Sequence, residues 1–290
     1  MFDKMLVGVD GRQGGRDAIA LAQQLAGLGD KLVLANVYGP RVPGRTLATA
    51  DHEAEDLLES ERRQMGLRAA ESVVFADTKP GRGLQELAGR ESADLLVIGS
   101  THRGPVGRVL LGDATLSALN GAPCAIAVAP AGYGAADHKL RTIGIGHDGS
   151  DESELALMAA RSLAAAHNST LRVLAVVSLQ TVSSDTPTPL DWTHETERVM
   201  KAEQARVDAI EGVSGEVAYG DPSEELAAFA NELDLLIVGS RGHGPIGRLL
   251  SGSSSTYLAR RCPCPLIVVP RSVIEPRSQA TTAADRGRNQ

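Results

Sequence analysis

Short apolar runs alternate with amphipathic stretches along nearly the whole chain. In the first half, apolar runs lie at 5–9, 32–37, 72–76, 94–98 and 125–128. In the second half, they lie near 142–146, 171–177, 215–219, 234–238 and 265–269. Between the runs, apolar positions at helical spacing predict helices near 13–28, 51–65, 83–90, 113–119, 151–167, 193–211, 223–231 and 253–261. Continuous apolar strands that alternate with helices are typical of a parallel sheet covered on both faces.

One segment of this pattern occurs twice. Residues 99–112 and 239–252 both begin with Gly-Ser, contain Gly-Pro, and end in glycine. The two segments are 140 residues apart, and so are Cys124 and Cys264. A period this long indicates two domains rather than a solenoid of small units. The sequence therefore predicts an α/β protein with two tandem, doubly wound, parallel five-stranded sheets.

The domain boundaries follow from composition and from the repeat. The length of 290 residues is enough for two domains that each bury their own core. We expect the first domain at 1–130, a linker at 131–140 and the second domain at 141–270. Residues 271–290 are polar and lack periodicity, which is typical of a disordered tail.

Charge and cysteine content narrow the class of function. The net charge of −7 argues against a dedicated nucleic-acid binder, because such binding needs a basic face. No apolar stretch approaches the roughly 20 residues that span a bilayer, and charged residues interrupt the start of the chain where a signal peptide would lie. We therefore expect a cytoplasmic protein with neither a nucleic acid nor a membrane as partner. The three cysteines are interpreted as reduced, structural thiols.

Candidate binding chemistry follows the ends of the strands. Ligands of open parallel sheets bind beyond the carboxyl ends of the strands, at the switch in strand order. Asp10 and Asp148 follow the first strand of each copy, Val37 and Val176 end the second, and the glycine-rich segments follow the fourth. A carboxylate there can accept from a ribose hydroxyl or an adenine amine, and an apolar side chain can pack on a base. Loop amides and the next helix N-terminus can hold phosphates.

These features predict one nucleotide site in each copy. The candidate residues of the first copy are Gly8, Asp10, Val37, Gly99, His102, Gly104, Arg108 and Gly112. Those of the second copy are Gly146, Asp148, Val176, Gly239, Ser240, Arg241, Gly242, Gly244, Arg248, Gly252, Ser253 and Ser254. No catalytic residue and no protein metal site are predicted. A Mg²⁺ ion is expected only as a companion of a bound nucleotide, held by phosphate oxygens and water.

The layout resembles the universal stress protein family in its tandem-domain form, over residues 1–270. The family's ATP-binding pattern is Gly, two residues, Gly, nine residues, Gly, then Ser or Thr. The second copy matches it with Gly239, Gly242, Gly252 and Ser253. The strand-one aspartate of the family maps onto Asp148. The resemblance implies an adenine nucleotide alpha hydrolase-like, Rossmann-like fold, ATP as the ligand, and a role in stress response or regulation.

The first copy departs from the family pattern. His102 stands at the place of the second glycine, Asp113 at the place of Ser or Thr, and Arg12 at the place of the small Ser150. A carboxylate at Asp113 would occupy the helix N-terminus that should hold phosphate. We therefore expect the second copy to be the main ATP site, and ATP binding by the first copy stays an open alternative.

Catalysis is expected to be slow or absent. No Walker lysine follows the glycines, and no general base or nucleophile is paired within the repeated segment. The leading interpretation is an ATP-binding regulatory protein. Two alternatives remain: a slow ATPase or phosphotransfer enzyme, and an interaction protein with vestigial sites. A flavoprotein is disfavoured, because only 3% of the residues are aromatic.

The last strand of each copy suggests how the copies pack. Both 125–128 and 266–269 are apolar and would lie at a sheet edge, and an unpaired apolar edge needs cover. The sequence thus predicts that the two domains pair through these strands around a pseudo-twofold axis, as the family resemblance also implies. Association of the whole chain into a homodimer is a further expectation.

Overall fold

A computed structural model of the chain describes residues 2–27, 29–39, 46–100, 115, 117, 123–178, 189–240 and 253–270. The first half holds strands β1 (Lys4–Gly8), β2 (Lys31–Tyr38), β3 (Glu71–Ala76), β4 (Leu95–Gly99) and β5 (Ala125–Ala129), with helices α1 (Gln13–Leu25), α2 (Leu47–Gln64) and α3 (Pro80–Arg90). The second half holds β6 (Thr142–Gly146), β7 (Thr170–Val177), β8 (Ser214–Tyr219), β9 (Leu235–Gly239) and β10 (Leu266–Val269). Its helices are α5 (Asp151–His167), α6 (Pro189–Asp208), α7 (Pro222–Phe229) and α8 (Ser253–Arg261).

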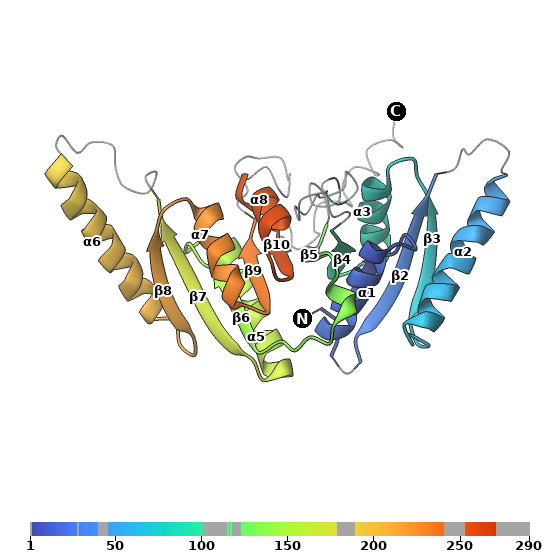
Figure 1. Cartoon of the computed structure of the whole chain (residues 1–290), viewed down its shortest axis with the longest axis horizontal. Coiled ribbons are helices and arrows are strands. Elements are labelled where there is room, and N and C mark those ends of the chain that lie inside the picture. The colour runs from blue at the N-terminus through green and yellow to red at the C-terminus, as the bar shows by residue number, and fades with distance from the viewer. Residues whose placement is uncertain are drawn as a thin grey trace, which may run out of the picture.

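All ten strands form one sheet with the order β3-β2-β1-β4-β5-β10-β9-β6-β7-β8 (Figure 1). Each half is parallel, and the halves meet where β5 and β10 pair antiparallel, with Ile267 opposite Ala127. This confirms the predicted pairing of the last strands. The two five-stranded sheets predicted from the repeat are thus the two halves of a continuous sheet.

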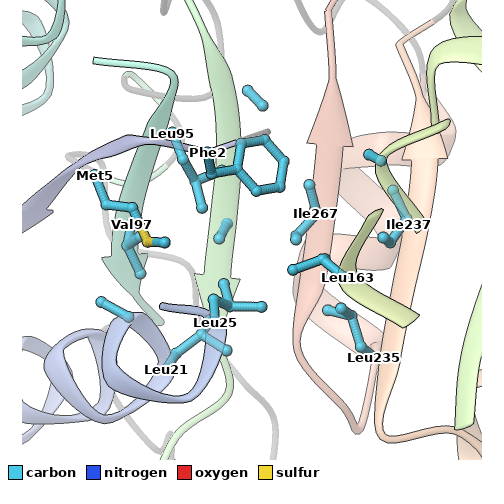
Figure 2. Close-up of a cluster of buried hydrophobic side chains, with 14 of the residues drawn as sticks. Phe2, Met5, Leu21, Leu25, Leu95, Val97, Leu163, Leu235, Ile237 and Ile267 are labelled. Atoms are coloured by element: carbon cyan, nitrogen blue, oxygen red, sulfur yellow. The ribbon is translucent and has the colours of Figure 1, made fainter. Parts of the chain in front are cut away.

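The strands are buried because helices cover both faces of the sheet. Helices α1, α2, α5 and α6 contribute to one apolar cluster, which runs across the β5–β10 seam. Figure 2 shows part of it, with Leu21 and Leu25 on one side of the seam and Leu163, Ile237 and Ile267 on the other. Helices α3 and α8 and the end of α7 contribute to a second cluster on the opposite face. The sheet is therefore doubly wound, as predicted.

Several predicted helix boundaries were wrong. Helix α2 begins at Leu47 rather than at 51, because the Thr46 hydroxyl accepts a hydrogen bond from the Thr49 N–H and caps its first turn. Helices α3 and α6 begin at Pro80 and Pro189 rather than at 83 and 193, since proline fits the first helical position. Helices α1 and α6 also end three residues earlier than predicted. The expected tail 271–290 lies outside the described residues, as does the helix at 113–119 except for Thr115 and Ser117, which are helical.

The segment at 131–140 joins the two halves and is docked on the first. It contains the short 3-10 helix η1 (Tyr133–Ala135). The buried carboxylate of Asp17 in α1 accepts hydrogen bonds from the N–H groups of Gly132 and Gly134, both at 2.8 Å. Tyr133 is buried, and its ring stacks on His138 with centroids 3.9 Å apart. The connection between the halves is therefore held in place by α1.

Candidate functional site

The strand register places several candidate residues side by side, at the same height along neighbouring strands, where the strands reach their carboxyl ends. In the second half, β6 lies between β7 and β9, so Asp148, Val176 and Ser240 each stand two residues beyond positions that pair with one another. In the first half, β1 lies between β2 and β4, and Asp10 is level with Val37 in the same way. The switch in strand order therefore falls beside each aspartate, at the place where open α/β sheets generally bind ligands.

Both aspartates hold the turn into the next helix. Oδ1 of Asp148 accepts from the N–H of Ser150 at 3.1 Å and from its hydroxyl at 2.5 Å. Oδ1 of Asp10 accepts from the N–H of Arg12 at 3.1 Å. Both aspartates are exposed. The turns thus present a carboxylate at the surface beyond each first strand.

The two helices that follow these turns begin differently. The Ser150 hydroxyl caps α5 by accepting a hydrogen bond from the Ser153 N–H, whereas Arg12 makes no side-chain cap at the start of α1. The departure of the first copy at Arg12 therefore removes a helix cap.

The first glycine of each repeated segment is required by packing. A Cβ atom on Gly99 would lie 1.9 Å from the carbonyl oxygen of Gly14 in α1. A Cβ atom on Gly239 would lie 2.6 Å from the carbonyl carbon of Glu152 in α5. These distances are far below van der Waals contact, so only glycine lets each helix lie this close to the strand end. This packing need operates whether or not a ligand is bound.

The valines show which face of the sheet each candidate site uses. Val37 and Val176 are half-buried and pack against the second apolar cluster, to which α3, α7 and α8 contribute. Gly146 lies on the same face, since a Cβ atom there would lie 2.9 Å from Leu226 of α7. Helix α8, which follows the repeated segment of the second half in the chain, contributes to the apolar cluster on this face as well.

The helix beside each valine begins with opposite charge. In the first half, Lys79 and Arg82 lie at the start of α3, and buried Asp77 accepts from the Lys79 N–H and from Arg82 Nη2, both at 2.9 Å. The Arg82 hydrogen bond is the main reason that the pKa of Asp77 lies below its usual value. In the second half, Asp221 caps α7 and Glu224 and Glu225 follow. The helix start beside the candidate site is therefore basic in the first half and acidic in the second.

A buried histidine beside the second site was not anticipated from the sequence. His147 precedes Asp148 and is 3% exposed. Its Nδ1 accepts from Arg206 Nη1 at 2.6 Å, so Nε2 carries the proton and donates to Glu154 at 3.0 Å. Arg206 also pairs with Glu203. The position of His147 directly before Asp148 could have pointed to this residue. No sequence pattern pointed to its partner Arg206, which lies 59 residues away.

Ser100 and Ser240, the second residues of the two repeated segments, use their backbone N–H groups in hydrogen bonds to the sheet. The Ser240 N–H donates to the Val269 carbonyl at 2.8 Å, and the Ser100 N–H donates to the Ala129 carbonyl at 2.9 Å. Amide donors for a phosphate would therefore have to come from later residues. The buried Ser100 hydroxyl, which the sequence did not single out, has no hydrogen-bond partner within the described part of the chain.

Nine of the candidate residues lie outside the described ranges, namely His102, Gly104, Arg108, Gly112, Arg241, Gly242, Gly244, Arg248 and Gly252. Ser253 and Ser254 are the first residues of α8, and their side chains are not described. Within the described ranges, no group of three or more His, Cys, Asp or Glu side chains is placed to hold a metal ion. No described helix is long and apolar enough to cross a membrane.

The fold and the strand-end geometry define a doubly wound α/β protein built from two copies of one unit. The sequence profile of the universal stress protein family matches residues 1–130 and again residues 139–270. The chain therefore belongs to the universal stress protein family, in its tandem form.

Individual relatives agree. A Thermus aquaticus universal stress protein is 33% identical over 137 residues, covering 45% of this chain and 98% of its own. A Mycobacterium tuberculosis universal stress protein is 28% identical over 221 residues, covering 72% of this chain and 73% of its own. The crystal structure of a universal stress protein from Archaeoglobus fulgidus superposes with a TM-score of 0.68 at 17% identity, over 93% of this chain and 99% of that one. That last likeness establishes the fold alone.

Proposed function

We propose that this chain is an ATP-binding regulatory protein of the cytoplasm, that its second half is the main nucleotide site, and that it hydrolyses ATP slowly or not at all. The observation that carries the proposal is the common level of Asp148, Val176 and Ser240 at the switch in strand order. A carboxylate, an apolar surface and the start of a glycine-rich segment are what a nucleoside triphosphate requires at one place.

In this proposal, each group has a separate task. Asp148 accepts hydrogen bonds from the ribose or the base, and Val176 packs on the adenine ring. The segment from Gly242 to Gly252 and the N-terminus of α8 at Ser253 hold the phosphates through backbone N–H groups. A Mg²⁺ ion would bind with ATP, through phosphate oxygens and water rather than through protein ligands.

The main test replaces Gly252 with glutamate. A side chain and a negative charge beside the phosphates should remove several backbone contacts, at a cost of about 3 kcal/mol, which is more than a hundredfold in ATP affinity. Isothermal titration calorimetry measures the loss, and circular dichroism checks that the variant is folded. Gly112→Glu is the matched control, because it makes the same change in the first half. If Gly252→Glu binds ATP as tightly as the original chain, the proposed site is misplaced.

The opposite charges at the starts of α3 and α7 should also affect how tightly each half binds ATP. Negative charge on Glu224 and Glu225 in the first turn of α7 would disfavour a phosphate nearby, whereas Lys79 and Arg82, the latter paired with Asp77, would favour one in the first half. Replacing both glutamates with glutamine should tighten ATP binding by the second half about threefold, from the usual size of a charge effect at a helix N-terminus. A titration with two equal, tight sites in the original chain would contradict the proposed difference between the halves.

Turnover tests the regulatory interpretation. The Asp148 carboxylate accepts a hydrogen bond from the Ser150 hydroxyl, but that hydroxyl also caps α5, so we expect it to be a poor nucleophile and hydrolysis to be slow. Purified chain with ATP and Mg²⁺ should release phosphate far below the typical enzyme range of about 1–10³ s⁻¹. A rate inside that range would favour an enzyme over a sensor.

A further inference from the structure

Two thiols lie in contact at the end of the second half. Cys262 follows the last residue of α8, and Cys264 lies two residues before β10, with Pro263 between them. Their Sγ atoms are 3.6 Å apart, and both residues are buried, at 7% and 8% exposure. The Cys262 N–H donates to the Leu258 carbonyl at 2.7 Å, which fixes its backbone on the last turn of α8.

We propose that Cys262 and Cys264 form a reversible dithiol–disulfide site that is oxidised by a small peroxide. The sulfurs need to approach only from 3.6 Å to the about 2.05 Å of an S–S bond. Residues two apart in a chain have Cα atoms at most about 7 Å apart, which is close to the upper limit for a disulfide. A small rearrangement on either side of Pro263 is therefore enough to close the bond.

The two thiols are not equivalent. The hydrogen bond with Cys262, together with burial, raises the pKa of the Cys264 thiol well above its usual range. Cys264 therefore keeps its proton, and its S–H can stabilise negative charge on the Cys262 sulfur. We take Cys262 as the attacking residue and Cys264 as the resolving residue; the disulfide itself rests on the 3.6 Å contact and does not depend on this order.

The chemistry balances with a peroxide as the oxidant. The Cys262 thiolate attacks one peroxide oxygen, an S–O bond forms, and the O–O bond breaks. The departing oxygen takes up the proton that Cys262 released, which gives water or an alcohol and leaves a sulfenic acid. The Cys264 sulfur then attacks the Cys262 sulfur, the S–S bond forms, and hydroxide leaves with the Cys264 proton as water. The two thiols lose two electrons and the peroxide gains them. A thiol reductant restores the dithiol by exchange.

Burial of the two cysteines favours a small oxidant, and the sequence restricts the site to the second half. Because both cysteines are more than nine-tenths buried, a compact peroxide reaches them more readily than a bulky disulfide does. The first half does not have the pair: Cys124 matches Cys264 at the 140-residue offset, but the residue that matches Cys262 is Ala122. The site therefore belongs to the second half alone.

The test uses the full chain in its reduced form, treated with hydrogen peroxide and then denatured and alkylated. Before treatment, all three cysteines should be alkylated; afterwards only one should be, and the intact mass should fall by two hydrogens. Dithiothreitol should restore all three. In Cys124→Ser, the number of alkylated cysteines should fall to none. Full alkylation after treatment, a gain of oxygen without loss of hydrogens, or a disulfide that includes Cys124 would each overturn the proposal.

The division of roles has its own test. In Cys264→Ser, peroxide should leave a sulfenic acid on Cys262 that dimedone labels. In Cys262→Ser, Cys264 should be labelled far less, because burial alone still raises the pKa of its thiol. Circular dichroism establishes that both variants are folded. Equal labelling of the two variants would contradict the assignment of Cys262 as the attacking residue.

Discussion

The two halves share one strand order, but the polar residues that connect their first two helices differ. The positively charged residue is on the first of these helices in one half and on the second in the other. In the first half, Arg16 of α1 makes a bidentate ion pair with buried Glu61 of α2, at 3.0 to 3.2 Å. In the second half, the position matching Arg16 is Glu154 of α5, which is joined to Arg206 of α6 through His147. The cation has moved from the first helix of the pair to the second.

This reversal teaches that the fold requires a polar connection between these helices but not a particular set of residues. Glu61 raises the pKa of the Arg16 guanidinium through a hydrogen bond and through its charge, so the first-half pair is a fully ionic contact. The second-half connection passes through a neutral ring. By contrast, the strand-end glycines are the same in both halves, because backbone approach leaves no alternative.

The largest loss of stability in either half should come from replacing those glycines. Gly99→Ala would bring a Cβ atom to 1.9 Å from a backbone oxygen, whereas Gly239→Ala would reach 2.6 Å from a backbone carbon. We expect Gly99→Ala to lower the free energy of unfolding by about 3 kcal/mol and Gly239→Ala by about 2 kcal/mol, since backbone atoms cannot step aside. Urea denaturation measures both.

Gly89 provides the control for the two alanine variants. It lies inside α3, and a Cβ atom there would meet its nearest neighbour at an ordinary 3.8 Å. Gly89→Ala should raise stability by about 0.5–1 kcal/mol through helix propensity. The packing argument fails if Gly99→Ala is as well tolerated as this control.

The helix connections should respond unequally to loss of the arginine. Arg16→Met leaves the Glu61 carboxylate buried without its partner, and we expect a loss of about 2 kcal/mol, less than for a fully buried pair because Arg16 is partly exposed. Arg206→Met removes a hydrogen bond to a neutral ring and a partly exposed ion pair with Glu203, and should cost about 1 kcal/mol. Thermal or urea denaturation of both variants tests the order. The double variant Arg16→Met with Glu61→Met should be more stable than Arg16→Met alone.

Acid should loosen the start of α3. The pKa of Asp77 is lowered, first by the Arg82 hydrogen bond and then by the Lys79 N–H, so the ionised carboxylate stabilises the fold. That contribution is complete above the usual aspartate pKa of about 3.9 and is lost as the pH falls toward the lower folded value. The protection of the α3 amides against hydrogen exchange, relative to intrinsic exchange at the same pH, should therefore fall with acid, and Asp77→Asn should remove this fall. An acid response in α3 that is the same with and without Asp77 would contradict the assignment.

The smallest effect is expected at Tyr133, between the halves. Burial is the main cause that raises its pKa to about 12, so the neutral ring stabilises the fold below pH about 10 and that stability is lost as the pH rises toward 12. Its hydroxyl has no hydrogen-bond partner within the described part of the chain. Tyr133→Phe should change the free energy of unfolding by at most about 0.5 kcal/mol at pH 7. In alkaline denaturation, the variant should lose less stability between pH 10 and 12.

The sequence predicted the strands and their order of succession well, because buried parallel strands leave long apolar runs. It also predicted the seam, since the runs at 125–128 and 266–269 had no other cover. It placed the helix starts too late at Leu47, Pro80 and Pro189, where polar residues and proline look like a loop in the sequence.

The site was only partly accessible from the sequence. The register that makes Asp148 and Val176 level follows from alternation and strand order, so it could be anticipated. The Arg206–His147 contact could not be, because it joins positions 59 residues apart with no pattern between them. The capture of Gly132 and Gly134 by Asp17 was hidden for the same reason.

The hydrogen bonds from Gly132 and Gly134 to Asp17 affect how the β5–β10 seam depends on protein concentration. Two separate chains held along a β5–β10 contact would part on dilution, because their association obeys mass action. Here the second strand of the seam is delivered by the same chain, through a connection that Asp17 keeps against α1. The effective concentration of one half at the other is set by that short connection rather than by how much protein is present. The ten-stranded sheet should therefore survive at the lowest concentrations at which the chain itself stays folded.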